Sequence, residues 1–275
     1  MESIYHIETD LVCRVLHYGT ELCIAKPGQD VSISLRKGRH KLSFISTENT
    51  QDSYSIFYEA PENDIEDCIE VKLWGICRSR LIKEGKLVDL GLSVLWASCN
   101  LGASKPEEYG DYFAWGETEP KKYYYSANYK WFKGDGYTKY CRNKYDSCSG
   151  GSLDGKTVLD AEDDAARVNL GRSWRMPTDI EWAELQEKCR WVWTTRNGVT
   201  GCEVTGPNGN SIFLPAAGFW IDSVFCAAGS QAIYWSSSLG DRGFALMRYF
   251  YSSDVRWSRA DGHRAQGHSV RPIAD

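Results

Sequence analysis

Residues 160–189 read DAEDDAARVNLGRSWRMPTDIEWAELQEKC, and this stretch decides the expected fold class. Its first part opens with a run of acidic side chains, which the dipole of a helix favours in the N-terminal turn. We therefore predict a helix that begins near Asp160 and ends near Gly171.

A second helix is predicted directly after Pro177. Thr178 suits the N-cap position, and Glu181 three residues later completes a capping box. Short strands follow, separated by turn signals at residues 196–198 and 206–209. Two helices followed by many short strands favour an α+β fold with an irregular sheet. The residues at helical spacing on one face of the second helix are Trp182, Leu185 and Cys189.

The N-terminal part of the chain has the alternation of half-buried strands at residues 5–8 and 31–35. Gly38 lies in a charged turn, so we predict a hairpin in which residues 40–45 return alongside residues 31–35. Two further strands are expected at residues 53–59 and 68–73. This unit resembles the PEGA-type domain, a small β module of bacterial surface proteins, in the segments 25–28 and 35–38.

These patterns predict three parts of the chain. Residues 1–77 form a small all-β domain, and residues 78–87 form a linker or a short helical bridge. Residues 88–275 form the larger second domain.

Composition limits the classes of function. The formal net charge is −5, which argues against a nucleic-acid partner because such a partner needs a basic face. No apolar run reaches the roughly 18 residues of a membrane span. The N-terminus does not resemble a signal peptide, so we expect a cytoplasmic protein, or a cell-surface one if an export signal has been removed. Reduced cysteines are expected, although Cys141 and Cys148 are spaced to pair across a loop.

The segment 239–271 has an unusual choice of charged residues. It contains Arg, His and Asp but neither Lys nor Glu, although both are abundant elsewhere in the chain. Arg and Tyr give a large contact area at low entropic cost, while Ser and Gly adapt to a ligand. The segment therefore predicts a binding face. Trp235 and Trp257 are expected to brace it, and Arg271 is expected to clamp the terminal strand through a carboxylate or carbonyl fork.

The second domain also resembles a known family through motifs in a fixed order. It is similar to the C-type-lectin-fold domains of gut Bacteroidetes that are labelled Fibrobacter succinogenes major paralogous domains. The resemblance implies a C-type lectin fold, with two helices and irregular antiparallel sheets, for residues 88–275. The motifs are VDLGLSVLWA (88–97), YGDYFAWGE (109–117), SWRMPT (173–178), LPAAG (214–218), YWSSS (234–238) and SVRP (269–272).

Some members of that family resemble variable proteins of diversity-generating retroelements. In these proteins adenine miscopying diversifies Asn codons, which can then encode Arg, Tyr, Ser, Asp, His, Gly or Ala but never Lys or Glu. Such codons also never encode Met, Trp or Gln, so Met247, Trp257 and Gln266 depart from this pattern. The resemblance implies that the ligand-binding positions are Asp241, Arg242, Arg248, Tyr251, Ser253, Asp254, Arg256, Ser258, Arg259, Ala260, Asp261, His263 and His268.

The sequence thus predicts a non-enzymatic protein that binds an unknown protein or cell-surface ligand, without cofactor or metal. Two alternatives stay open: a fixed-sequence adhesin or envelope subunit, and an oxidase like the formylglycine-generating enzymes, with Cys202 and Cys226 as copper ligands. A calcium site at the acids of residues 160–164 is disfavoured because a helix N-terminus explains them. The binding hypothesis expects Arg248, Arg256 and Arg259 to point outward, and it would fail if these three arginines pointed inward and were locked in ion pairs within the interior.

Overall fold

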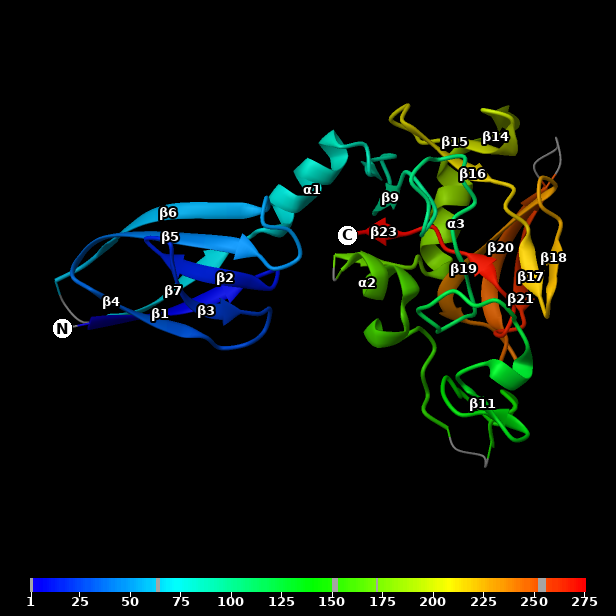
Figure 1. Ribbon diagram of the computed structural model, residues 1–275, viewed down its shortest axis with the longest axis horizontal. Coiled ribbons are helices and arrows are strands. Elements are labelled where there is room, and N and C mark those ends of the chain that lie inside the picture. The colour runs from blue at the N-terminus through cyan, green and yellow to red at the C-terminus, as the bar shows by residue number, and fades with distance from the viewer. Residues whose placement is uncertain (1, 63–64, 150–152, 172, 252–255) are drawn as a thin grey trace. The chain divides into compact units, whose positions relative to one another are not determined.

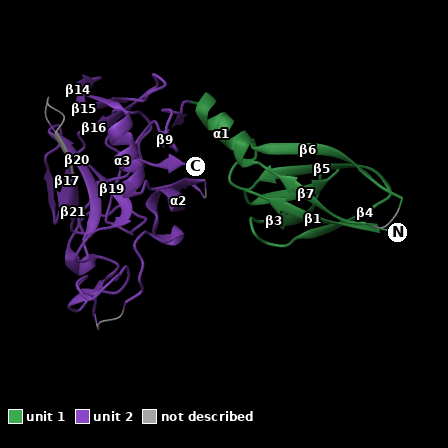
Figure 2. Cartoon of the chain, turned by 180° about the vertical axis from the view of Figure 1, so that it is seen from behind, with its two compact units in different colours: residues 1–84 green, residues 85–275 purple. Residues whose placement is uncertain are grey.

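The computed structural model describes residues 2–62, 65–149, 153–171, 173–251 and 256–275 (Figure 1). The chain divides into two compact units, Met1–Glu84 and Gly85–Asp275 (Figure 2). Strands account for 44% of the structure and helices for 13%, so the chain is mostly β.

The expected α+β class with a C-type lectin fold was wrong. The described residues form three α-helices and several small sheets, and no C-type lectin fold is identified. The cap signals located real helices, but α2 and α3 have only 6 and 10 residues. Cap signals mark where a helix begins and do not show how the remaining chain is arranged into sheets.

The first unit contains two sheets, with strand orders β4-β1-β7 and β3-β2-β5-β6. Tyr5 and Ile7 alternate with more exposed residues on β1 and are buried, as the two-residue period of a strand requires. The strands of this unit are β1 (Glu2–Thr9), β2 (Cys13–His17), β3 (Thr20–Ala25), β4 (Ser32–Arg36), β5 (Gly38–Ser46), β6 (Ser53–Ala60) and β7 (Glu66–Val71).

The hairpin predicted around Gly38 was wrong, although both of its strands form. β4 pairs antiparallel with β1, whereas β5 pairs with β2 and β6 in the other sheet. Gly38 has a φ of +126°, a region that favours glycine, and it lies where the chain passes from one sheet to the other. Alternation indicates which face of a strand is buried, but it does not indicate which strand is its neighbour.

Most of the segment expected to be a linker or helical bridge belongs to helix α1 (Trp74–Lys83). Cys77 and Leu81 are its buried residues. Arg80 Nε lies 2.8 Å from Oδ1 of Asp52, whose side chain is almost fully buried. This ion pair and the apolar contacts make α1 part of the first unit.

The second unit is built around a five-stranded sheet of order β10-β22-β19-β20-β21 and a four-stranded sheet of order β13-β23-β9-β8. A three-stranded sheet, β14-β15-β16, and the pairs β11-β12 and β17-β18 complete it. Its first strands are β8 (Leu87–Val88), β9 (Leu95–Ala97), β10 (Tyr112–Phe113), β11 (Phe132–Lys133), β12 (Gly136–Tyr137), β13 (Trp174–Arg175), β14 (Arg190–Arg196) and β15 (Val199–Thr205). The remaining strands are β16 (Ser211–Pro215), β17 (Phe219–Ile221), β18 (Val224–Cys226), β19 (Gln231–Leu239), β20 (Ala245–Tyr251), β21 (Arg256–Gly262), β22 (His268–Ser269) and β23 (Ile273–Ala274).

The helix predicted after Pro177 is confirmed as α3 (Asp179–Lys188). The capping box is also present: Thr178 Oγ1 accepts from the Glu181 amide, and the Glu181 carboxylate accepts from the Thr178 amide at 2.7 Å. α3 packs against β19 and β20 (Figure 1). This helix therefore supports the inner face of the sheet that carries the C-terminal segment.

The helix predicted from about Asp160 is divided. A short 3-10 helix, η3 (Ala161–Asp163), precedes α2 (Ala165–Leu170). The chain breaks between them because Asp164 takes an extended conformation, and its carboxylate caps α2 by accepting from the Arg167 amide. Another 3-10 helix, η1 (Ser126–Asn128), lies earlier in the unit.

A disulfide joins Cys141 and Cys148, whose Cα atoms are 5.9 Å apart. The expectation of reduced cysteines was therefore wrong for this pair, which closes the loop anticipated from its spacing. The other cysteines all lie among the described residues and are free there.

Candidate ligand-binding face

The predicted binding segment forms the outer part of the five-stranded sheet in the second unit. β20 pairs antiparallel with β19 on one side and with β21 on the other, and β21 is an edge strand. Alternate residues of β20 therefore face α3 or the opposite side of the sheet. A seven-residue strand is roughly 20 Å long, so residues at its two ends cannot contact one small ligand.

Four exposed candidate positions lie close together at one end of strands β19, β20 and β21. Asp241 and Arg242 lie in the turn between β19 and β20, Asp261 lies near the end of β21, and His263 follows it; all are exposed. The Asp261 Oδ1 atom accepts from the Asp241 amide at 3.4 Å, and the His263 ring lies 4.8 Å from the Phe244 ring. We name Asp241, Arg242, Asp261 and His263 the turn cluster.

Arg248 does not meet the expectation that it point outward. Its side chain is 9% exposed, and its Nη2 atom lies 2.7 Å from Asp179 Oδ1 at the start of α3. It also donates to the Asp179 carbonyl oxygen and to Gln186. Burial lowers the pKa of this guanidinium, while Asp179 opposes the change. Arg248 therefore fastens β20 to α3 and is not available to a ligand.

Arg259 lies directly opposite Arg248 in the strand register and shares the same carboxylate. Its Nε atom is 2.9 Å from Asp179 Oδ2, but its own side chain is 54% exposed. Asp179, the common partner of both arginines, was not among the residues predicted from the sequence. Its position in the first turn of α3 was visible in the sequence, but the pairing of β20 with β21 was not.

His268 is also part of the interior. It is 1% exposed, its ring centroid lies 4.2 Å from that of Trp235, and it approaches Phe219 at 5.6 Å. Burial lowers its pKa to about 3. A neutral, enclosed imidazole cannot serve as a surface contact, so this predicted position lies outside any face that a ligand reaches.

The other candidates fall along the hairpin or beyond the described residues. Tyr251 and Ala260 are partly buried. Arg256 and Ser258 lie in β21, and their side chains are outside the described part of the structure. The candidates outside the described residues are Ser253 and Asp254.

Buried residues of β19 and of the C-terminal segment support strands β20 and β21. Trp235 is fully buried in β19, and its indole Nε1 donates to the Phe113 carbonyl at 2.7 Å. The fork predicted for Arg271 is confirmed: it is fully buried and donates to the carbonyl oxygens of Ala97 and Phe213 at 3.1 and 2.7 Å. The side chain of Trp257, the other expected brace, is outside the described part of the structure.

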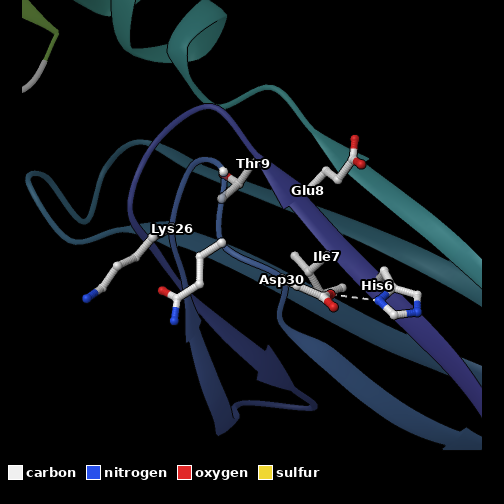
Figure 3. A pocket seen from close by; sticks show the side chains of 8 residues that line it. His6, Ile7, Glu8, Thr9, Lys26 and Asp30 are labelled. Carbon is white, nitrogen blue, oxygen red and sulfur yellow. Dashed lines mark hydrogen bonds and ion pairs between the residues drawn. The ribbon is translucent and has the colours of Figure 1, made fainter.

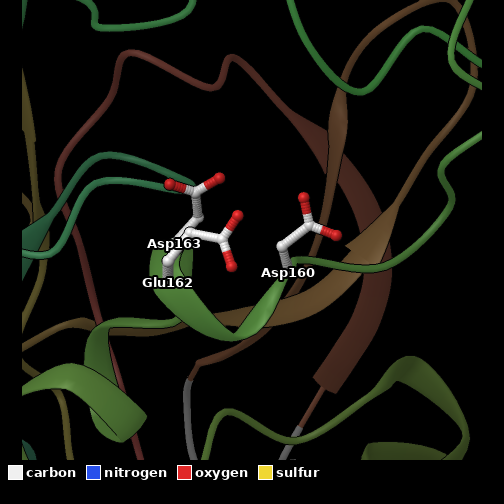
Figure 4. Close-up of side chains that lie close together, drawn as sticks. All are labelled: Asp160, Glu162 and Asp163. Carbon is white, nitrogen blue, oxygen red and sulfur yellow. The ribbon is translucent and has the colours of Figure 1, made fainter.

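Asp160, Glu162 and Asp163 are the one group of potential metal ligands found among the described residues (Figure 4). The Lys139 ammonium lies 2.6 Å from both Asp160 Oδ2 and Asp163 Oδ2. Burial opposes ionisation of Asp163, but hydrogen bonds from Lys139, Tyr140 and Lys130 outweigh it and lower the pKa. Cationic side chains of the chain itself therefore neutralise these acids.

The first unit has a shallow cavity of about 520 Å³ beside β1 (Figure 3). His6 Nδ1 lies 2.8 Å from Asp30, and Nε2 lies 2.7 Å from Glu66. Hydrogen bonds to Asp30 and then to Glu66 raise the pKa of His6. Both carboxylates are exposed, so these pairs are screened by solvent and contribute little to stability.

The cysteines considered as copper ligands lie in different environments. Cys202 is fully buried in β15, where burial raises its pKa to about 12. Cys226 belongs to β18 and is partly exposed. A buried, protonated thiol suits core packing better than metal binding, which requires the thiolate.

No protein-family model, curated protein or solved structure matches this chain. Within the described part of the chain, no helix is long and apolar enough to cross a membrane.

Proposed function

We propose that this chain is a non-enzymatic ligand-binding protein that presents exchangeable residues on a fixed β frame, in the manner of a diversity-generating retroelement variable protein. The partner is a protein or another large surface. The N-terminal β unit, which resembles a PEGA-type module, presents the binding unit. No C-type lectin fold is needed for this mechanism.

One observation carries the proposal: the residues of the Lys- and Glu-free segment separate into two sets. Asp241, Arg242, Asp261 and His263 are exposed in a turn and at a strand end, while Arg248 and His268 are locked inside. A surface tolerates substitution only where its side chains do not hold the backbone in place. Surface changes away from special features usually alter stability by less than about 0.5 kcal/mol. Arg242 and His263 therefore supply the exchangeable contacts of the turn cluster, whereas Asp261 accepts from the Asp241 amide and Asp241 accepts from Arg142.

The first test is substitution tolerance. Variants that replace Arg242 and His263 together with Ser or Tyr should keep the free energy of unfolding within about 1 kcal/mol of the unsubstituted chain, as measured by urea denaturation. Arg248→Ser should cost on the order of 2–3 kcal/mol, somewhat less than the loss of a fully isolated buried pair because Arg259 still faces Asp179. Equal destabilisation by both sets would contradict the proposal.

The second test is the DNA around the gene. Diversification requires a near-identical repeat that carries adenines at the turn-cluster codons, next to a gene for a reverse transcriptase. A locus without such a repeat would overturn the diversification and leave a binding module of fixed sequence.

A further inference from the structure

A second feature of the same sheet lies at the opposite end of β20 from the turn cluster. Trp193 of β14, Gly229, Ser230, Gln231 and Tyr251 line a shallow groove of about 390 Å³. Small-molecule and peptide-side-chain sites commonly have volumes of about 300–1,000 Å³. Gln231 and Tyr251 lie directly opposite each other in the strand register, so their side chains share one face of the sheet.

Aromatic rings continue from this groove along β20. Tyr249 and Tyr251 lie on the same face and stack with nearly parallel rings, their centroids 5.8 Å apart and their planes inclined by 6°. Trp193 extends the aromatic surface from the neighbouring sheet. Together the stacked tyrosine rings and the Trp193 indole form an aromatic surface, which suits apolar groups that repeat along an extended ligand.

The groove also holds hydrogen-bonding groups that the described chain does not use. The indoles of Trp182, Trp191 and Trp235 all donate to backbone carbonyl oxygens. Within the described residues, the Trp193 indole N–H, the Tyr251 hydroxyl and the Gln231 amide have no such partner. The groove therefore offers several donors to an incoming acceptor.

The charge of the groove narrows the ligand class. Among the described residues that line it none is charged, although charged residues make up 25% of the chain. A phosphate, carboxylate or ammonium group would be desolvated there without a counter-charge, which is unfavourable. The occupant is therefore neutral, with apolar rings and free hydrogen-bond acceptors.

We propose that this groove binds a proline-rich segment in the polyproline II conformation. Such a segment has pyrrolidine rings, no N–H at its prolines and fully solvated carbonyl oxygens, and its stiffness lowers the entropic cost of binding. Aromatic-lined grooves are the usual docking surface for this conformation. Trp193, Tyr251 and Tyr249 contact the rings, while the Trp193 indole and Gln231 amide donate to the carbonyls.

This inference goes beyond the proposed diversification: Tyr249 and Tyr251 belong to the Lys- and Glu-free segment, but Trp193 and Gln231 lie outside it, so variants of these two residues test the groove by itself. The probe is a fluorescein-labelled, end-blocked decaproline, with fluorescence polarisation as the measurement on the full chain. Saturable binding is expected, and a blocked Gly-Ser peptide of the same length should bind at least about tenfold more weakly. Trp193→Ala should weaken decaproline binding about tenfold or more, as loss of an aromatic anchor does.

Two further variants keep the test decisive if Trp193→Ala fails to fold. Gln231→Ala and Trp193→Phe should each weaken binding about three- to tenfold, since each removes a donor from the groove. Tyr125→Ala, an exposed aromatic away from the groove, is the matched control and should leave binding unchanged. Absence of saturable binding, or equal binding by all variants, would overturn the proposal. Saturable binding of maltoheptaose in place of decaproline, measured by calorimetry and lost in Gln231→Ala, would overturn it in favour of a saccharide site.

Discussion

His268 illustrates at the residue scale how burial alters the chemistry of a side chain. Its ring is enclosed by Trp235 and Phe219, and burial lowers its pKa from the ordinary 6.5 to about 3. The unfolded chain takes up a proton as the pH falls below 6.5, while the folded chain does not until about pH 3. Stability is therefore lost progressively between these values, and His268 causes no loss above pH 6.5.

We predict that acidification from pH 7.5 to 5.0 removes about 2 kcal/mol of unfolding free energy through His268, because each pH unit below 6.5 costs about 1.4 kcal/mol. His268→Leu should lose this part of the pH dependence. Urea denaturation at both pH values gives the comparison. His263→Leu, at an exposed position, should retain the acid sensitivity of the unsubstituted chain. An unchanged pH dependence in His268→Leu would refute the prediction.

At the scale of elements, α3 connects β19, which carries the buried Trp235, with strands β20 and β21. Its first turn carries the capping box at Thr178 and Glu181, and Asp179 accepts both Arg248 and Arg259. The start of this helix thus fixes the position of β20. The indole of Trp182 on the same helix donates to the Trp235 carbonyl of β19 at 3.2 Å. The position of the sheet therefore depends on where α3 begins.

Thr178→Ala is predicted to reduce the stability of the second unit by about 1 kcal/mol, the usual cost of losing an N-cap oxygen. Thermal or urea denaturation measures the loss. Thr178→Ser, which keeps the hydroxyl, should recover most of it. Ser223→Ala in the exposed turn between β17 and β18 is the control and should have little effect. A cost no larger than that of the control would argue against the cap as an anchor.

At the scale of the whole molecule, each unit has its own buried residues. The first unit encloses Tyr5, Val15 and Phe44, and the second encloses Trp96, Trp182 and Trp235. The division after Glu84 falls just beyond α1, which the Arg80–Asp52 pair ties to the first unit. Separate cores imply that the units fold independently.

We predict that fragments 1–84 and 85–275, produced separately, each show a cooperative thermal transition and dispersed amide signals in NMR spectra. A fragment 1–73, which ends before α1, should be less stable than 1–84 because it loses the Arg80–Asp52 pair and the buried Leu81. If fragment 85–275 lacked a cooperative transition, the units would depend on each other and the prediction would fail.

The sequence by itself determined features that depend on neighbouring residues in the chain. The capping box at Thr178, the alternation of β1 and the turn at residues 196–198, where Asn197 and Gly198 take positive φ, all follow from local steric and hydrogen-bonding preferences. Part of the candidate site could also be predicted from the sequence, since the turn cluster lies at a turn and at the end of a strand.

Only the tertiary structure decided which residues of the binding segment face outward and how the strands pair. β4 and β5 have the alternation of a hairpin but lie in different sheets, because alternation does not specify a neighbouring strand. Arg248 and His268 fit a contact surface by residue type, yet Asp179 and Trp235, distant in sequence or on another strand, hold them inside. Burial is set by what packs against a side chain, and that neighbour is chosen by the fold.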